Sequence, residues 1–344
     1  MKIAIDCRYL GLSGLGRFTE GILSNLPENN SYLFWGNEDK IKKFRTGEII
    51  NDACNPFTLK GLFADKRIIK KINECDAFFT PNFILPYGLR VKIFSVIHDV
   101  VFMDLPKETT NGAFDRAIKK YFLKRCLKKS NNVFTVSEFS QKRIAAFFGK
   151  FADKVTVAYN GVPAATDDYA NTHTLPADKE NYIVYCGNIK KHKGLHTLLR
   201  AYSALSDDEN VPSLYIVGSA ENHRTSDEEI MRFFNAPGVH FTGRLDDDSL
   251  YDVISHAKFL IQPSLYEGFG MPPLEALRLR TKPIISDIEV FREIYGDSDV
   301  CFFECGNAEE LAKKIRICSP ECDGVVPEKF DTAKQTEIIF ERIR

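Results

Sequence analysis

The chain has 344 residues, of which 44% are hydrophobic and 27% charged, and its formal net charge is −1. This length exceeds what one hydrophobic core usually supports, so we expect two domains, and a composition without long apolar runs is that of a soluble globular protein rather than a membrane-spanning one. Residues 1–160 carry 26 Lys or Arg against 16 Asp or Glu, and residues 161–344 carry 20 against 31, so the first half is basic and the second acidic.

Short apolar segments alternate with longer helical stretches. The strands expected in the first half are residues 2–6, 32–35, 77–80, 92–97, 132–136 and 154–158. Those expected in the second half are residues 182–186, 213–217, 238–242, 258–261, 282–286 and 300–303. Strands separated by helices predict an α/β fold of two Rossmann-like, doubly wound parallel-sheet domains, which would face a ligand-binding cleft.

We place the first domain at residues 1–166 and the second at residues 167–330, with the polar stretch Asp167–Asn181 as a linker. Residues 331–344 are expected to form a C-terminal helix that packs back on the first domain. The chain opens on a strand-like segment rather than a signal peptide, and its nine cysteines are scattered, so we expect a cytoplasmic protein.

The first predicted strand leads into a glycine-rich loop at Arg8–Arg17, and a helix is expected from Phe18. Glycines let the backbone approach a ligand closely, so we interpret Gly14, Gly16 and Arg17 as a loop that contacts the acceptor or the donor phosphates. The G-x2-G-x-G spacing differs from the G-x-G-x2-G pattern of dinucleotide-binding folds. A dinucleotide site and a purely structural turn remain as alternatives.

His98 and Asp99 follow the fourth predicted strand. At the carboxyl end of a strand, His98 would hydrogen-bond a substrate hydroxyl and Asp99 would orient the imidazole. A capped loop explains the pair equally well. After the next strand, Ser137 is expected to cap a helix, which requires no ligand.

Residues 114–129 are the most basic segment of the first half. The residues with helical spacing are Phe114, Ile118, Tyr121, Phe122 and Arg125. They predict a basic amphipathic helix, which is either a core-facing helix with a solvated cationic back or a contact for anionic lipid or a phosphate-bearing acceptor. Further basic clusters at residues 40–45 and 66–71 favour the second interpretation. We expect no nucleic-acid partner, because no zinc-finger, RNP or basic-zipper pattern is present.

In the second half, the opening strand runs into Gly187–Leu195, which carries several cations ahead of a predicted helix. Cations that precede the start of a helix favour binding of an anion. We therefore assign Lys193 to the diphosphate of the donor, where it would offset the negative charge that grows on the leaving nucleotide. Solvated lysines are the alternative.

Two patterns raise the question of a metal ion. Asp246–Asp248 contains a D-x-D pattern, but these acids precede an apolar-periodic run and are better explained as the first residues of a helix. The cysteines Cys301, Cys305, Cys318 and Cys322 form two C-x3-C pairs, whereas a zinc knuckle usually has two intervening residues. We therefore predict no metal and no cofactor, so that lysine, arginine and helix N-termini supply the positive charge.

Residues 262–275 are the most informative segment. Gly268 and Gly270 break an apolar strand and two prolines open a helix, which places Glu267 in the turn and Glu275 on the helix. Because helical side chains tilt toward the N-terminus, Glu275 points back at the turn. We assign the glycine backbone and the helix N-terminus to phosphate or sugar oxygens, Glu275 to a ribose diol and Glu267 to sugar hydroxyls. An ordinary strand, turn and helix with solvated glutamates is the alternative.

Together these residues resemble a retaining glycosyltransferase of family 4, with the GT-B fold. The most specific part is Glu267 to Glu275, an E-x7-E pattern in the form E-G-F-G-x-P-x-x-E. The resemblance implies that Glu267 contacts the donor sugar and that Glu275 holds the ribose. The other donor-binding residues that it implies are Ser264, Gly268, Phe269, Gly270, Met271 and Gly243.

Similar enzymes pair the lysine with an arginine five or six residues earlier, but the matching residue here is Asn188. Lys190 and Arg17 are therefore candidates for the second cation on the diphosphate. Chains with a G-N-I-K-x-H-K segment and a His-Asp pair resemble mannosyl- or rhamnosyl-type transferases of surface polysaccharides.

The expected function is retaining transfer of a hexose, with mannose as the best guess, from a nucleoside diphosphate sugar to a glycan or polyprenyl-linked acceptor. Glu267, Lys193 and His98 are the expected catalytic residues. The enzyme would work in the cytoplasm, peripheral to the inner face of the membrane. The alternatives are a nucleotide-sugar epimerase and an inactive nucleotide- and membrane-binding module.

Overall fold

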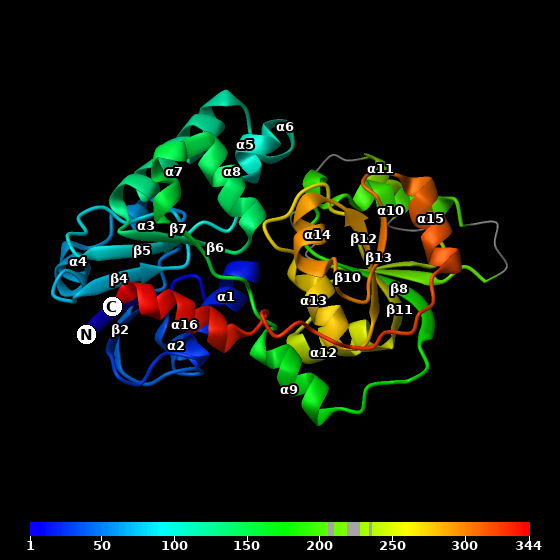
Figure 1. Ribbon diagram of the computed structural model, residues 1–344, viewed down its shortest axis with the longest axis horizontal. Coiled ribbons are helices and arrows are strands. Elements are labelled where there is room, and N and C mark those ends of the chain that lie inside the picture. Colours follow the sequence, from blue (N-terminus) through cyan, green and yellow to red (C-terminus); the bar gives the residue numbers. More distant parts are fainter. Residues whose placement is uncertain (206–209, 219–227, 234–235) are drawn as a thin grey trace. The chain divides into compact units, whose positions relative to one another are not determined.

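A computed structural model describes residues 1–205, 210–218, 228–233 and 236–344 and divides the chain into two compact units (Figure 1). Unit 1 consists of Met1–Pro106, Thr110–Pro163 and Lys329–Arg344, and unit 2 consists of Lys107–Thr109 and Ala164–Glu328. Each unit is built around one parallel sheet, of seven strands in unit 1 and six in unit 2. The predicted α/β fold class with two Rossmann-like domains is therefore confirmed.

The sheet of unit 1 has the strand order β3-β2-β1-β4-β5-β6-β7, which reverses direction next to β1 as in doubly wound folds. Its strands are β1 (Lys2–Asp6), β2 (Ser31–Gly36), β3 (Glu48–Asn51), β4 (Ala77–Thr80), β5 (Lys92–Val96), β6 (Asn132–Thr135) and β7 (Val155–Val157). The helices of unit 1 are α1 (Ser13–Ser24), α2 (Glu38–Ile41), α3 (Leu59–Leu62), α4 (Lys66–Ile72), α5 (Val101–Asp104), α7 (Ala113–Lys129), α8 (Glu138–Phe148) and the 3-10 helix η1 (Gly149–Lys154). Between α5 and α7 lies α6 (Pro106–Thr109), of which only Pro106 belongs to unit 1.

The last helix of the chain, α16 (Thr332–Ile343), belongs to unit 1 and packs on α1 (Figure 1). Its first turn is capped by Asp331. The Gln335 side chain donates to the carbonyl of Ala158 at 3.2 Å. A Cβ added to Gly161 would lie 2.1 Å from the nitrogen of Thr332, so the backbones touch there.

The sheet of unit 2 has the order β10-β9-β8-β11-β12-β13. Its strands are β8 (Glu180–Cys186), β9 (Ser213–Val217), β10 (Val239–Gly243), β11 (Ala257–Gln262), β12 (Lys282–Asp287) and β13 (Cys301–Glu304). Its helices are α9 (Ala164–Thr172), η2 (Lys191–Lys193), α10 (Leu195–Ser203), α11 (Glu228–Arg232), α12 (Asp247–His256), α13 (Met271–Arg278), α14 (Glu289–Tyr295) and α15 (Ala308–Ile317). Because all strands are parallel, their carboxyl ends meet at one edge, where the loops can gather side chains.

Every strand predicted from the sequence is present, but β3 was missed. This strand has only Ile49 and Ile50 as apolar residues and lies at the edge of its sheet, where neither face must be fully buried.

The predicted linker Asp167–Asn181 is wrong, because α9 occupies its first part and β8 begins at Glu180. Tyr169 anchors α9: its ring is buried and its hydroxyl donates to Asp252 at 3.3 Å. A single buried aromatic side chain was too weak a periodic signal to predict the helix.

Candidate functional site

The turn between β11 and α13 has the strand, glycine turn and helix that its sequence predicts. Gly270 precedes α13 with a φ of 90°, and a Cβ there would lie 2.4 Å from the ring of Phe291. The hydroxyl of Tyr295 donates to the carbonyl of Gly270. This packing fixes the backbone from which α13 starts.

Glu267 lies at the centre of a hydrogen-bond network. Both of its carboxylate oxygens lie 2.7 Å from Nζ of Lys193. Oε1 also accepts from the Ser264 hydroxyl at 2.7 Å and from Nε2 of Gln262 at 3.3 Å. The Glu267 side chain is only 8% exposed, whereas that of Lys193 is 24% exposed. The carboxylate is therefore held in place, while part of the Lys193 side chain remains exposed to solvent.

Lys193 reaches Glu267 because two loops are joined through their backbones. The amide of Leu265 donates to the carbonyl of His192 at 2.8 Å. Gly194 follows with a φ of 69°, and a Cβ there would lie 1.9 Å from the carbonyl oxygen of Pro263. Only glycine permits so close an approach in this conformation.

Glu275 is 4% exposed and lies on α13, as predicted. Burial raises the pKa of Tyr295 well above its usual value, and the negative charges of Glu267 and Glu275 raise it further. Both carboxylates therefore lie near the same buried phenol. The turn and the first turns of α13 bring the two acids to one site.

The remaining predicted donor residues of unit 2 occupy the same sheet edge. Gly268, Phe269 and Gly270 are buried, Met271 and Gly243 are partly buried, and Asn188 and Lys190 are exposed. The carbonyl of Asn188 accepts from the hydroxyl of Tyr185 at 3.3 Å. Burial, reinforced by the charge of Glu267, raises the pKa of this phenol. Tyr185 thus connects the loop after β8 with the surroundings of Glu267.

Gln262 is a site residue that the sequence interpretation missed. Its Nε2 donates to the Ser264 hydroxyl at 2.8 Å as well as to Glu267. Its Oε1 is buried and has no hydrogen-bond partner among the residues that the structure describes. The available signal was a polar residue at the end of an otherwise apolar strand, which places an amide at the carboxyl edge of a parallel sheet.

His98 lies in unit 1, after β5, and is partly buried. Its Nε2 lies 2.9 Å from the carbonyl oxygen of Pro81, so this nitrogen carries the proton, and its ring packs edge-on against Phe18. The expectation that Asp99 orients the ring is wrong, because the Asp99 carboxylate accepts from the amide of Val101 instead. A backbone carbonyl, which no sequence pattern marks, positions the imidazole.

The pKa of His98 implies a pH-dependent stability. Burial lowers this pKa below its usual value of 6.5, opposed by the Pro81 hydrogen bond and the Asp99 charge. The unfolded chain then takes up the proton first, so the unfolding free energy should fall as the pH drops from about 7 to about 5. The lone Trp35, buried in unit 1, reports this unfolding by fluorescence in urea. The fall in unfolding free energy should be smaller in His98→Asn than in wild type. In the control His240→Asn, which replaces an exposed histidine of unit 2, the fall should equal that of wild type. Equal falls in all three proteins would contradict the attribution of this pH dependence to His98.

The predicted loop that contains Gly14, Gly16 and Arg17 is wrong in its extent, because α1 begins at Ser13 and all three residues lie on the helix. A Cβ added to Gly16 would lie 2.8 Å from the nitrogen of Gly11, so the preceding loop folds back on the helix. The low helix propensity of glycine misled the interpretation, since close backbone packing is what requires glycine here.

The acidic segment Asp246–Asp248 starts α12, as predicted. The Asp246 side chain caps the helix by accepting from the amide of Ser249 at 2.8 Å. This contact accounts for the D-x-D pattern without an ion.

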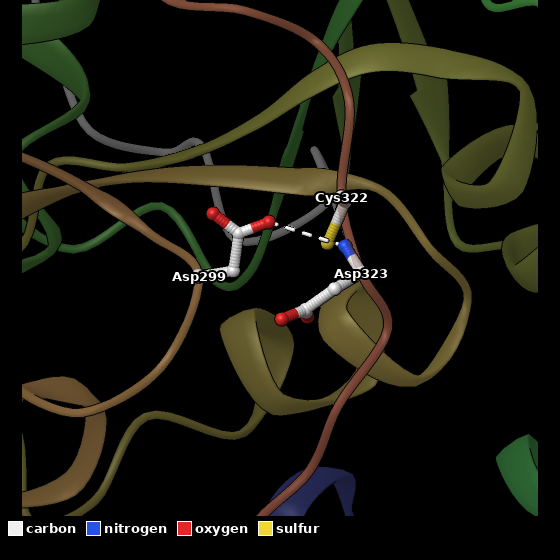
Figure 2. Close-up of side chains that lie close together, drawn as sticks. All are labelled: Asp299, Cys322 and Asp323. Carbon is white, nitrogen blue, oxygen red and sulfur yellow. Dashed lines mark hydrogen bonds between the residues drawn. The ribbon is translucent and has the colours of Figure 1, made fainter.

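The four cysteines of the C-x3-C pairs do not gather at one point in the described part of the chain. The one potential ligand group of three or more there combines Cys322 with Asp299 and Asp323 (Figure 2). The Asp299 carboxylate already pairs with the ammonium group of Lys282 and accepts from the amide of Asp323 at 3.1 Å. Burial raises the pKa of the Cys322 thiol. A carboxylate with its own counter-ion beside a neutral thiol is a poor cation site, and we assign no metal to it.

Comparison with solved structures defines the class of fold. The chain superposes on Anabaena HepE in complex with UDP-glucose with a TM-score of 0.73, at 15% identity, over 99% of this chain and 98% of HepE. It superposes on the sucrose-phosphate synthase of Thermosynechococcus elongatus with a TM-score of 0.66, at 15% identity, over 100% and 94% of the two chains. The chain therefore has the GT-B fold of glycosyltransferases.

Sequence comparison finds a family match in the second unit. Residues 171–318 match the family described as glycosyl transferases group 1. It is 28% identical over 228 residues to the O-antigen chain mannosyltransferase RfbU of Salmonella typhimurium, covering 66% of this chain and 61% of RfbU. It is 25% identical over 232 residues to O-antigen chain mannosyltransferase B of Escherichia coli, covering 63% and 58%. The similarity thus spans about three fifths of these relatives.

Proposed function

We propose that this protein is a retaining glycosyltransferase that moves a hexose from a nucleoside diphosphate sugar to a hydroxyl of a glycan or lipid-linked glycan. The observation that carries the proposal is the contact of Lys193 with both oxygens of Glu267, beside α13, within the residues that match the glycosyl transferases group 1 family. The names of the similar O-antigen mannosyltransferases support mannose and a glycan acceptor. The complex of HepE with UDP-glucose supports a nucleoside diphosphate sugar as the donor.

The proposed mechanism needs no nucleophile from the enzyme. The bond between the anomeric carbon and the diphosphate oxygen breaks as the acceptor hydroxyl attacks from the same face, and the leaving phosphate takes the hydroxyl proton. Lys193 stabilises the charge that grows on this phosphate, together with the positive end of the α13 dipole and the N–H of Met271, since Pro272 and Pro273 have no N–H to donate. Glu267 holds Lys193 in place and hydrogen-bonds the sugar hydroxyls.

Two assays distinguish a glycosyltransferase from an epimerase and from an inactive binding module. The protein is incubated with GDP-mannose, UDP-glucose or a dTDP-sugar, first alone and then with a mannose-terminated oligosaccharide. A glycosyltransferase extends the oligosaccharide, and proton NMR of the new anomeric centre tests retention. Conversion of the donor alone into an isomer would identify an epimerase, and binding without any turnover would identify an inactive module.

The nucleotide is best identified by a thermal-shift panel of GDP, UDP and dTDP, because a ligand that binds only the folded protein raises its Tm. We propose GDP, because the similar proteins are named mannosyltransferases. A larger shift with UDP or dTDP would overturn this choice without affecting the proposed transfer.

Glu275→Gln tests the proposed ribose contact. The substitution preserves shape but removes the charge that strengthens a hydrogen bond to the diol, so the Kd for the nucleotide should rise by about tenfold or more. Calorimetric titration of the nucleotide measures this directly, and kcat at saturating donor should change less. The control is Glu180→Gln, an exposed glutamate at the start of β8. Equal nucleotide affinity in wild type and Glu275→Gln would refute the ribose assignment.

We propose that the transfer needs no divalent ion, since Lys193 and the start of α13 supply positive charge. Activity should survive EDTA, and loss of activity that Mg²⁺ or Mn²⁺ restores would refute this.

In the described part of the chain, no helix combines the length and apolarity required to cross a bilayer. We propose a cytoplasmic enzyme, which cell fractionation tests.

A further inference from the structure

Unit 1 exposes a row of large apolar side chains. Leu59 is 77% exposed and Phe63 62%, and Phe114, Ile118 and Tyr121 on α7 are 80%, 39% and 54% exposed. The three α7 residues are spaced so that they lie on one side of the helix.

Tyr87 joins the two halves of this row. Its ring stacks on Phe63 with centroids 4.9 Å apart, and its hydroxyl lies 3.1 Å from that of Tyr121. Arg125 holds the arrangement: its guanidinium lies 4.0 Å from the Tyr87 ring centroid and donates to the carbonyl of Leu85 at 2.6 Å. The row is thus built by contacts between α3, the turn after Leu85 and α7. We call it the aromatic row, comprising Leu59, Phe63, Tyr87, Phe114, Ile118 and Tyr121.

The aromatic row is not the core face of α7. The buried residues of this helix are Leu123, Cys126 and Leu127, all in its second half. The interpretation in which Phe114, Ile118 and Tyr121 face the core is therefore wrong. The first half of α7 presents its apolar side chains to solvent, an arrangement that a soluble surface rarely retains without a partner.

Cations surround the aromatic row. Residues 57–71 carry five Lys or Arg and one Asp, and residues 113–129 carry seven and one. Both acids are already paired, Asp65 with Arg67 and Asp115 with Lys119. Lys60, Lys120 and Lys124 are exposed. The partner must therefore offer apolar surface together with negative charge.

We propose that the aromatic row and its flanking cations form a docking surface for an anionic phospholipid bilayer. Exposed aromatic and aliphatic side chains enter the boundary between headgroups and acyl chains, while lysines around them pair with lipid phosphates. The two chemistries complement the two components of an anionic membrane surface. The proposal concerns unit 1 alone and does not depend on the sugar-nucleotide site of unit 2.

The test is co-sedimentation of the full chain with vesicles of phosphatidylcholine alone or with about one third phosphatidylglycerol. Wild type should bind only the anionic vesicles, and NaCl at about 1 M should weaken binding, because the Debye length falls to roughly 3 Å. Lys120→Glu should lower the partition coefficient about fivefold or more, since each basic residue near an anionic membrane surface contributes to the free energy of binding. Phe114→Ser should lower it about tenfold.

Matched controls lie on α15 of unit 2, where Lys313 is exposed and Ile317 is 63% exposed. Lys313→Glu and Ile317→Ser repeat both chemical changes away from the proposed surface and should bind as wild type does. Trp35 fluorescence in urea verifies that unit 1 stays folded in each variant. The proposal is overturned if wild type ignores anionic vesicles or if the α7 and α15 variants behave alike. It is also overturned if sedimentation velocity shows that a second copy of the chain covers the row, with Phe114→Ser abolishing the dimer.

Discussion

Lys193→Ala is expected to lower kcat by about 10² to 10³-fold, which is the usual cost of removing one group that stabilises developing negative charge. The loss has two physical parts. The leaving diphosphate loses a cation, and Glu267, whose side chain is only 8% exposed, loses its counter-ion. Single-turnover measurements at saturating donor would report the chemical step directly. The effect on KM should be smaller, because the leaving-group charge develops in the transition state.

Two further variants make this result specific. Lys193→Arg keeps the charge but not the compact ammonium group that contacts both carboxylate oxygens, so its kcat should lie between wild type and Ala. Lys313→Ala removes an exposed lysine of the same unit and should leave kcat unchanged. A Lys193→Ala enzyme with wild-type kcat would exclude Lys193 from the transfer step, whatever the donor proves to be.

Gly194→Ala is expected to destabilise unit 2 by about 3 kcal/mol or more, because it combines backbone strain with a steric clash. The φ of 69° disfavours any side chain, and the new Cβ would lie 1.9 Å from the carbonyl oxygen of Pro263. The two loops would have to separate, which would also break the contact of Lys193 with Glu267. Urea unfolding followed by far-UV circular dichroism measures the loss.

Gly306→Ala separates strain from clash. Its φ is 80°, but no atom lies within 4 Å of an added Cβ, so only the conformational cost of about 1 to 2 kcal/mol applies. The transition reported by Trp35 should be unaffected in both variants if the units unfold independently, since this tryptophan lies in unit 1. Equal destabilisation by Gly194→Ala and Gly306→Ala would mean that the stability of unit 2 does not depend on the close approach of Gly194 to Pro263.

Most strands of both sheets and the conformation of the β11–α13 turn could be predicted because they depend on short-range patterns. Apolar runs reveal buried parallel strands, and glycines and prolines place Glu267 in the turn and Glu275 on α13. The elements that were missed, β3 and α9, carry too few apolar residues for such a signal. Their identity depends on neighbours that the local sequence does not contain.

The partnership within the site could not be predicted. Lys193 and Glu267 are 74 residues apart, and the tie between them runs through the backbones of His192 and Leu265. The contact of His98 with a carbonyl oxygen could not be read from residue types either. The polar Gln262 at the end of an apolar strand indicated a site residue but not its partner Glu267. The α7 helix shows a different limit: the spacing grouped Phe114, Ile118 and Tyr121 on one side of the helix, but this side is exposed, and the buried side is formed by Leu123, Cys126 and Leu127.

The return of α16 to unit 1 has a consequence for synthesis of the chain. Residues Ala164–Glu328 leave the ribosome before Lys329–Arg344, which complete unit 1. Because domains fold as units during translation, unit 2 can finish folding while α1 still lacks its helical neighbour. An assembly order in which unit 1 is completed last follows directly, and a released chain truncated before Lys329 should keep unit 2 resistant to protease while leaving unit 1 open to cleavage.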